Sequence, residues 1–255
     1  MSDGRPEVVA DEIYSVLPRA GGPLDDAAIA DHYSDGTSET WLRVNFVSSV
    51  DGGATVNGLS GGLGGPADHR VFDLLRTLCD VVVVASGTVR AEGYGAMILD
   101  EAAARARVAR GLAAQPTFAI VSGSLDLDPA SEIFAAAPVR PLVMTVDGAP
   151  PPPGLAKVAD VVPCGVGRVD PAAMVKELTG RGLGRIHCEG GPSLFGSLLE
   201  ADVVDELCLT VSPLLVGGSS ARIVRGDVPT PRTMLLAGIL RSGSTLLTRY
   251  TRVIP

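Results

Sequence analysis

The chain has 255 residues, of which 46% are hydrophobic and 20% charged, a balance typical of a globular protein with a sizeable core. Its net charge of −8 argues against a nucleic-acid-binding protein, because such proteins usually carry a basic stripe. No apolar run approaches the roughly 20 residues that a membrane-spanning helix needs, and the N-terminus lacks the basic start and apolar core of a signal peptide, so we expect a cytoplasmic protein.

Residues 1–40 are polar and punctuated by Gly, Pro and Asp, and two stretches in them, 11–17 and 25–33, match short helices. We interpret residues 1–40 as an N-terminal extension that packs on a single domain formed by residues 41–255. This domain begins with a strand at 41–50, which leads into a Gly-rich loop.

Helices and strands alternate along the rest of the domain. The predicted helices are 66–79, a short helix within 87–93, 99–113, 170–182 and 192–202. The predicted strands are 80–86, 116–122, 140–147, 158–164, 185–189 and 205–218, and a hairpin closes the chain at 233–255. This order indicates an α/β fold with a mostly parallel central sheet flanked by helices and an antiparallel C-terminal hairpin edge.

Cysteine and histidine usage argues against metal binding. The four cysteines form no C-x-x-C pair, which favours buried free thiols in a reducing compartment. The three histidines share no metal-ligand spacing, so we expect no metal site.

Ligands of open α/β sheets bind at the carboxyl ends of the strands, where several loops of this chain have unusual compositions. Segment 86–88 follows the valine-rich strand, and the Thr88 hydroxyl either caps the next helix or binds a phosphate. Ser122 and Ser124 follow another strand and suit the 2′-phosphate of NADP. The nearby Asp126 would suit NAD instead, and an ordinary polar turn explains the same residues equally well.

A glycine pair follows the strand at 185–189. Gly190 and Gly191 let a ligand approach the main chain, and a proline then occupies the first helical position. The amides of Ser193, Leu194 and Phe195 would be free at the positive end of that helix, which makes a cradle for a diphosphate. Such a turn also serves simply to pack a strand against a helix.

Three other polar residues carry little signal alone. Asp51 precedes a glycine at a strand end, where an Asp is most often a turn former. Arg76 lies on the polar side of an otherwise apolar helix, as surface arginines do. Ser60 is one polar residue of the Gly-rich loop.

Together, segments 49–61, 69–93 and 186–218 resemble the reductase domain of riboflavin biosynthesis, which is similar in fold to dihydrofolate reductase. The resemblance covers about residues 41–253. It implies NADPH-dependent reduction of 5-amino-6-(5-phosphoribosylamino)uracil, in which the ribose opens to an imine and receives hydride at its first carbon. It also implies a homodimer.

The resemblance, read with the loop compositions, gives the expected site. The cofactor is expected to contact Val47, Ala85, Ser86, Gly87, Thr88, Glu92, Ser122, Ser124, Gly190, Gly191, Pro192, Ser193, Leu194, Phe195, Gly196 and Ser197. The substrate is expected to contact Ser60, Arg76 and Glu189, with Arg76 as a partner for its phosphate. Asp51 and Glu189 are the candidate catalytic groups, and the sequence does not rank them as the acid.

The chain departs from the family pattern in two ways. Gly93 stands where a second acid is expected, and no matching arginine follows at once. We therefore also consider reduction of a pterin such as dihydrofolate. The H-x-E and P-C-x-x-C motifs of a zinc deaminase domain are absent, which indicates a stand-alone reductase. A non-catalytic NADP-binding regulator, and a flavin or NAD binder, are the alternatives from other classes.

Overall fold

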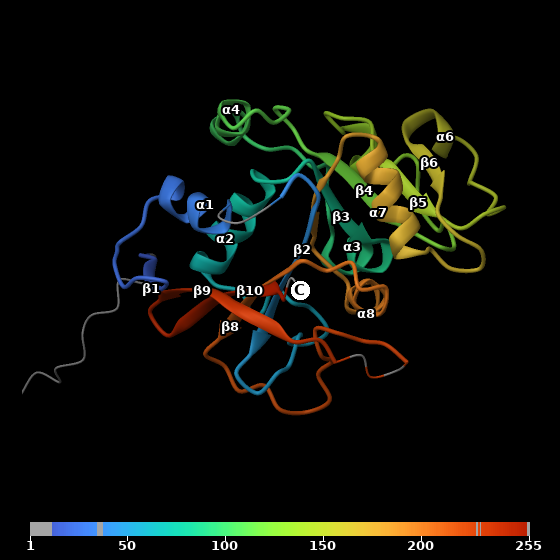
Figure 1. Ribbon diagram of the computed structural model, residues 1–255. Helices are drawn as coiled ribbons and strands as arrows, with labels where there is room; N and C mark the ends of the chain where they lie inside the picture. Colours follow the sequence, from blue (N-terminus) through green and yellow to red (C-terminus); the bar gives the residue numbers. More distant parts are fainter. Residues whose placement is uncertain (1–11, 35–37, 228, 230, 254–255) are drawn as a thin grey trace, which may run out of the picture.

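The computed structural model of the protein describes residues 12–34, 38–227, 229 and 231–253 (Figure 1). A ten-stranded sheet runs through it in the order β1-β9-β10-β8-β2-β7-β3-β4-β5-β6. The strands are β1 (Tyr14–Leu17), β2 (Trp41–Ser49), β3 (Val81–Ala85), β4 (Thr117–Val121), β5 (Leu142–Thr145), β6 (Asp160–Pro163), β7 (Arg185–Cys188), β8 (Glu206–Ser212), β9 (Met234–Ser242) and β10 (Thr245–Arg252). The helices are α1 (Asp26–Ser34), α2 (Pro66–Arg76), α3 (Ser86–Glu92), α4 (Glu101–Ala109), α5 (Glu132–Ala135), α6 (Leu155–Val158), α7 (Pro171–Gly180) and α8 (Pro192–Glu200).

Most of the sheet is parallel. From β8 through β2, β7, β3, β4 and β5 to β6, each strand pairs in parallel with its neighbour. β9 and β10 pair antiparallel and form the expected hairpin. β10 also pairs antiparallel with β8, and β1 pairs antiparallel with β9 at the edge of the sheet. The predicted α/β class with its antiparallel C-terminal edge is confirmed.

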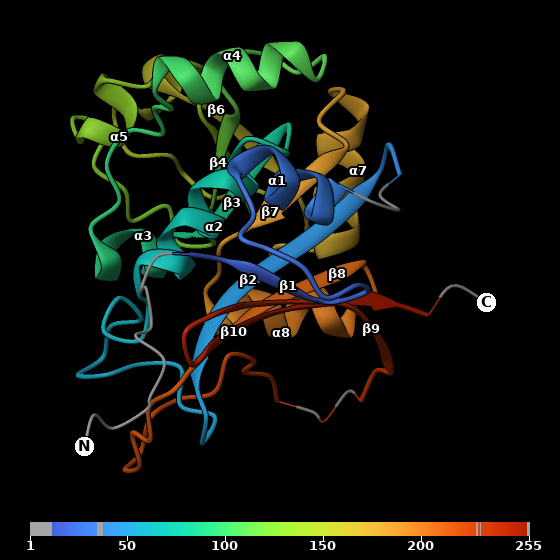
Figure 2. The same ribbon diagram turned by 90° about the vertical axis from the view of Figure 1, so that its left-hand side faces the viewer.

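Helices cover both faces of the sheet (Figures 1 and 2). Met174 of α7 and Leu198 of α8 belong to one buried cluster, together with valines of β2 and β3. Tyr33 of α1 and Leu75 of α2 belong to a second cluster with Leu247 of β10. Both faces are therefore occupied by the core, and the loops at the strand ends carry the polar residues discussed below.

Four elements differ from the sequence predictions. Residues 11–17, predicted as a helix, contain β1, because Tyr14–Leu17 covers the exposed edge of β9. The strand predicted at 205–218 ends at Ser212, since Pro213 has no N–H for the ladder and Leu214 already accepts a bond from Val50. The four-residue helices α5 and α6 were not predicted.

The described part of the N-terminal extension packs on the domain through β1 and α1, with Ile13 and Ile29 fully buried. The boundary at residue 40 stays a prediction. All four cysteines are buried and free, as expected. Within the described ranges, no three His, Cys, Asp or Glu side chains are grouped so that they could hold a metal ion. The helices of the same ranges are all too short or too polar to cross a membrane.

Candidate functional site

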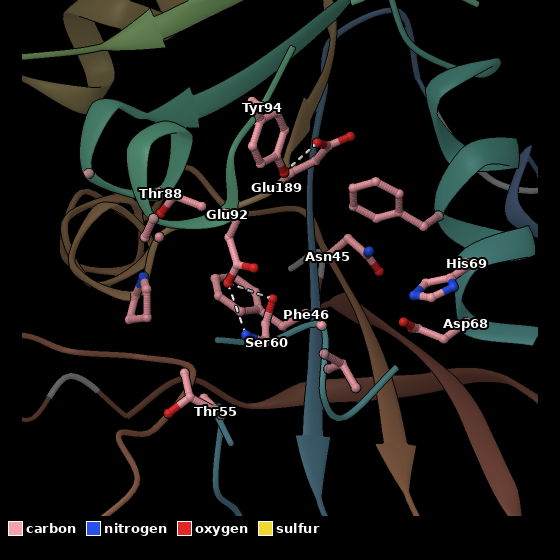
Figure 3. Close-up of a pocket in the computed structure, with 18 of the residues that line it drawn as sticks. Asn45, Phe46, Thr55, Ser60, Asp68, His69, Thr88, Glu92, Tyr94 and Glu189 are labelled. Carbon is pink, nitrogen blue, oxygen red and sulfur yellow. Dashed lines mark hydrogen bonds between the residues drawn. The ribbon is translucent and has the colours of Figure 1, made fainter. Parts of the chain in front are cut away.

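A cavity of about 520 Å³ lies at the carboxyl ends of the parallel strands. Its walls come from the end of β2, the Gly-rich loop, α2, α3, the segment after α3, and the junction of β7 with α8 (Figure 3). The lining residues are Asn45, Phe46, Val47, Ala54, Thr55, Gly58, Ser60, Gly61, Asp68, His69, Phe72, Arg76, Gly87, Thr88, Ala91, Glu92, Tyr94, Gly95, Ala96, Met97, Ile98, Glu189, Gly191 and Pro192. Because ligands of α/β sheets bind at this end, the cavity is the candidate site.

The cavity brings together residues from motifs far apart in the sequence. Predicted site residues that line it are Val47, Ser60, Arg76, Gly87, Thr88, Glu92, Glu189, Gly191 and Pro192. Predicted site residues outside the lining are Asp51, Ala85, Ser86, Ser122, Ser124, Gly190, Ser193, Leu194, Phe195, Gly196 and Ser197. Polar lining residues that were not predicted include Asn45, Asp68, His69 and Tyr94.

Glu189, directly after β7, forms a bidentate ion pair with Arg76. Its carboxylate accepts hydrogen bonds from Arg76 Nε at 2.7 Å and Nη2 at 2.9 Å, and from the Tyr94 hydroxyl at 2.9 Å. The Glu189 side chain is fully buried, whereas that of Arg76 is 18% exposed and packs on the Phe72 ring. From sequence, Arg76 was expected to meet a phosphate and Glu189 a base. The structure pairs these two side chains with each other.

Tyr94 stays a hydrogen-bond donor to Glu189. Burial and the nearby Glu189 carboxylate both raise the pKa of the Tyr94 phenol, so the hydroxyl is protonated at neutral pH. Tyr94 lies next to Gly93, the position where the sequence departs from the family pattern. The departure therefore places an aromatic hydroxyl on the cavity carboxylate.

Asp68, in the first turn of α2, is a cavity carboxyl group that was not predicted as a site residue. It is 8% exposed and lies near Thr210 of β8. Burial raises the pKa of Asp68 and outweighs the lowering effect of Thr210. A buried carboxyl group with a raised pKa in a cavity is a common feature of functional sites. Its sequence signal, an acid in a first helical turn, is explained equally well by the helix dipole.

The main chain at the glycine pair lies close to α3. Gly190 has a φ of +109°, a conformation that favours glycine. A Cβ atom on Gly191 would lie 2.5 Å from Thr88 Oγ1, so only glycine leaves room for that hydroxyl. The backbone of the turn and the Thr88 side chain thus meet at one edge of the cavity (Figure 3).

The cradle of free amides at the start of α8 is smaller than predicted. The Phe195 N–H donates to the Gly191 carbonyl at 2.9 Å and is not free for a ligand. Leu194 and Phe195 are buried, and the Phe195 ring stacks on a phenylalanine of β2. Gly196 is needed for packing, because a Cβ there would lie 2.0 Å from the Arg225 carbonyl oxygen. The amides of the first turn, before Phe195, are the ones left for an anion.

Ser60 and Glu92, predicted to bind different ligands, are bonded to each other. The Ser60 N–H and hydroxyl both donate to Glu92 Oε1 at 2.9 Å. Figure 3 shows that this contact joins the Gly-rich loop to the end of α3 across the cavity. A ligand that uses either side chain has to compete with this contact.

The serines predicted for the cofactor lie beside the cavity. Ser86 is the first residue of α3, and the Ala85 N–H donates to the Gly190 carbonyl at 2.8 Å, which ties β3 to the glycine turn. Ser122 is buried, whereas Ser124 is exposed, and each hydroxyl accepts a bond from a nearby backbone amide. Both are thus part of a polar turn at the end of β4.

Asp51 lies outside the cavity and braces two loops. Its carboxylate accepts hydrogen bonds from the Ser49 hydroxyl at 2.5 Å and from the amides of Val216 at 3.1 Å and Gly217 at 2.7 Å. These bonds lower the pKa of Asp51 to about 2, so the group is ionised at neutral pH. The geometry gives Asp51 a structural role, and its catalytic role stays a prediction.

Comparisons with known proteins agree on one family. The family model of the RibD C-terminal domain matches residues 40–248. The 2,5-diamino-6-ribosylamino-4(3H)-pyrimidinone 5′-phosphate reductase of Methanothermobacter thermautotrophicus is 31% identical over 192 residues, 73% of this chain and 84% of that protein. The protein of that name from Archaeoglobus fulgidus is 27% identical over 165 residues, 62% of this chain and 72% of that protein. Among solved structures, a pyrimidine reductase-like protein of Corynebacterium diphtheriae superimposes with a TM-score of 0.77 at 25% identity, covering 89% of this chain and 99% of that one. The matched range contains every residue that lines the cavity.

Proposed function

The chain belongs to the family of the RibD C-terminal domain, and we propose from this premise that it is a reductase of riboflavin biosynthesis acting on a ribosylaminopyrimidine phosphate. The base is a uracil, as the sequence resemblance implies, or a 2,5-diaminopyrimidinone, for which a relative is named. In either compound the ribose opens to an imine and hydride is added at its first carbon. The observation that carries the proposal is that Ser60, Arg76 and Glu189, from separate motifs, line one cavity with Thr88 and Gly191.

NADPH is the cofactor that we propose. The residues fit a dinucleotide, because the bare backbone at Gly191 and the Thr88 hydroxyl meet at the edge of the cavity. The helix that starts directly after Gly191 adds the amides of Ser193 and Leu194, which suit a diphosphate. Ser124, the exposed one of the two serines after β4, is our choice for the 2′-phosphate end. When bound, NADPH supplies the hydride, and the contribution of the protein is orientation and electrostatics.

Two carboxyl groups are proposed to act on the substrate. A carboxylate has about four lone-pair positions, and Glu189 uses three of them on Arg76 and Tyr94. Glu189 can therefore accept one further bond, from an N–H of the base. Asp68 is the group to which we assign the proton needed at the reacting nitrogen, because it lines the cavity and burial raises its pKa above the ordinary value of an aspartate.

We also propose a homodimer that acts in the cytoplasm. The family resemblance implies the dimer, and the closing hairpin supports it with large exposed apolar side chains. Leu235 on β9 is 54% exposed and Leu236 is 43% exposed. Exposed apolar residues that cluster on one element are typical of a protein interface.

The test is NADPH oxidation by the purified protein with each of three compounds, the uracil phosphate, the diaminopyrimidinone phosphate and dihydrofolate. We expect turnover of one of the two phosphates, and a clear preference for NADPH over NADH. Absence of turnover with both phosphates would refute the proposal. Tight NADPH binding without reduction of any of the three would favour a non-catalytic regulator.

Reduction of a dihydropterin is the second candidate, and the polar groups of the cavity favour it. Arg76 is the one Lys or Arg among the described lining residues, and it is already paired with Glu189. Asp68 offers a carboxyl group that can pair with the aminopyrimidine edge of a pterin. Turnover of dihydrofolate alone would establish this function.

A further inference from the structure

His187 of β7 is a buried imidazole without a hydrogen-bond partner. Its side chain is 1% exposed, and neither Nδ1 nor Nε2 is bonded to any of the described residues. Native proteins pair nearly all buried polar atoms, because an unpaired one costs free energy of folding. Two such atoms on one ring beside the candidate site therefore call for an explanation.

The surroundings of His187 are ionic. His187 and Glu189 lie two residues apart and face the same side of the sheet, with 3.6 Å between His187 Nε2 and Glu189 Oε1, too far for a hydrogen bond. Arg43, the register partner of His187 on β2, is ion-paired with Glu206. Burial, together with Arg43 and Arg76, keeps the pKa of His187 well below its usual value. The ring is neutral, and its Nε2–H tautomer can donate to a carboxylate.

Arg76 is bonded to Glu189 and is also the candidate partner of the substrate phosphate. The proposed substrate carries a phosphate, and Arg76 is the one Lys or Arg that lines the described cavity. A guanidinium that turns its Nε and Nη2 edge to a phosphate gives up its bonds to Glu189, whose side chain is fully buried. Removing the cationic partner of a buried carboxylate costs free energy unless another hydrogen-bond donor takes its place. Tyr94 is bonded to Oε2, so Oε1 is the atom that loses its donor.

We propose that His187 is a positioning residue, which donates its Nε2–H to Glu189 Oε1 when the substrate phosphate draws Arg76 away. A shift of about 0.7 Å brings the 3.6 Å separation to the length of an ordinary hydrogen bond. In the free protein the imidazole is unpaired, and the Oε1 atom that it faces is bonded to Arg76. This inference rests on the proposed function, since it requires a phosphorylated substrate.

The test compares His187→Leu, which lacks a donor, with His187→Gln, whose amide places an N–H near the position of Nε2. KM and kcat are measured for the phosphorylated substrate and for its dephosphorylated nucleoside. We expect His187→Leu to raise KM for the phosphorylated compound about 10- to 100-fold, the loss of one hydrogen bond to a charged group. KM for the nucleoside and the NADPH affinity should not change, and His187→Gln should restore most of the loss. The melting temperature should not fall, because the imidazole has no bond to lose.

Equal losses with both compounds, or no loss with either, would overturn the role of His187, and a purely structural residue would lower the melting temperature as well. If His187→Leu does not fold, the ring nitrogen signals of wild-type His187 provide a second readout by NMR. Adding the phosphorylated substrate should shift Nε2 to a hydrogen-bonded N–H, and unchanged signals would overturn the proposal. Wild-type enzyme that reduces neither compound contradicts the proposed function itself, whereas equal wild-type KM values for both overturn only the exchange at Arg76.

Discussion

Replacing Glu189 by Gln removes the charge that holds Arg76, and the structure sets the size of the effect. The amide keeps the shape of the side chain but cannot accept two charge-assisted bonds from the guanidinium. Breaking a buried ion pair costs roughly 3–5 kcal/mol. Because the Arg76 side chain is 18% exposed, we expect the lower value of about 2–3 kcal/mol. In a chain of 255 residues this lowers the melting temperature by about 4–12 °C.

The same substitution separates the cofactor from the substrate. NADPH affinity should stay within about twofold, since the Glu189 side chain is bonded to Arg76 and Tyr94 and not to the Thr88 edge, whereas reduction should fall about 100-fold or more. Calorimetry, NADPH titration by fluorescence and steady-state kinetics measure the three quantities. The control, Glu189→Gln with Arg76→Met, removes the unpaired charge and should recover at least half of the lost stability. A weakened NADPH affinity with an unchanged melting temperature would refute this reasoning.

Three further changes test other parts of the structure. Gly191→Ala should weaken NADPH binding about 10-fold or more, because its Cβ would lie 2.5 Å from Thr88 Oγ1, and an unchanged affinity in a titration would place the diphosphate elsewhere. Burial alone would raise the pKa of Glu206, but its ion pairs with Arg43 and Arg249 lower that pKa to about 2. The ionised carboxylate therefore stabilises the fold fully at pH values above the ordinary pKa of a glutamate, and this stabilisation is lost as the pH falls towards 2. Glu206→Gln should therefore melt earlier than wild type at pH 7 and show a flatter decline of melting temperature below pH 4.5, and parallel declines in the two proteins would count against this. Asp51→Asn should loosen the loop at 213–218, seen as faster proteolysis there, with kcat within about twofold of wild type. A kcat loss above about 10-fold would instead support the catalytic role predicted for Asp51.

The local spacing of apolar residues was enough to predict most of the helices and strands. The four valines of β3 and the apolar spacing of α2 have one reading each, and the lack of helices before the last strands required an antiparallel edge. The segment 11–17 was mistaken for a helix because four residues are too few to show a period of two. Its strand exists because β9 offers an edge, and that information lies more than 200 residues away in the chain.

The sequence predicted some of the residues that line the cavity, but not how they pair with one another. The motifs supplied Ser60, Arg76, Thr88 and Glu189, and all four line the cavity. What the sequence could not reveal is that Arg76 is bonded to Glu189, because these residues are 113 positions apart. Pairing of this kind depends on how the elements pack together in three dimensions.

Asp68 was missed for the same reason, because its environment also depends on how the elements pack together. Asp68 looks like any acid in a first helical turn, and only the packing of α2 against β8 buries it beside Thr210. The surroundings of Asp51 were not predictable either, because the loop at 213–218 supplies the amides that hold its carboxylate ionised.

The most direct test of the central claim follows the hydride itself. The purified protein is incubated with the ribosylaminopyrimidine phosphate and NADPH deuterated at nicotinamide C4, and the product is analysed by mass spectrometry and NMR. We expect a ribitylamino product with a single deuterium on the first carbon of the chain, formed in step with NADPH oxidation. A product without deuterium at that carbon, or NADPH that is not consumed, would contradict the assignment of this protein as a pyrimidine reductase.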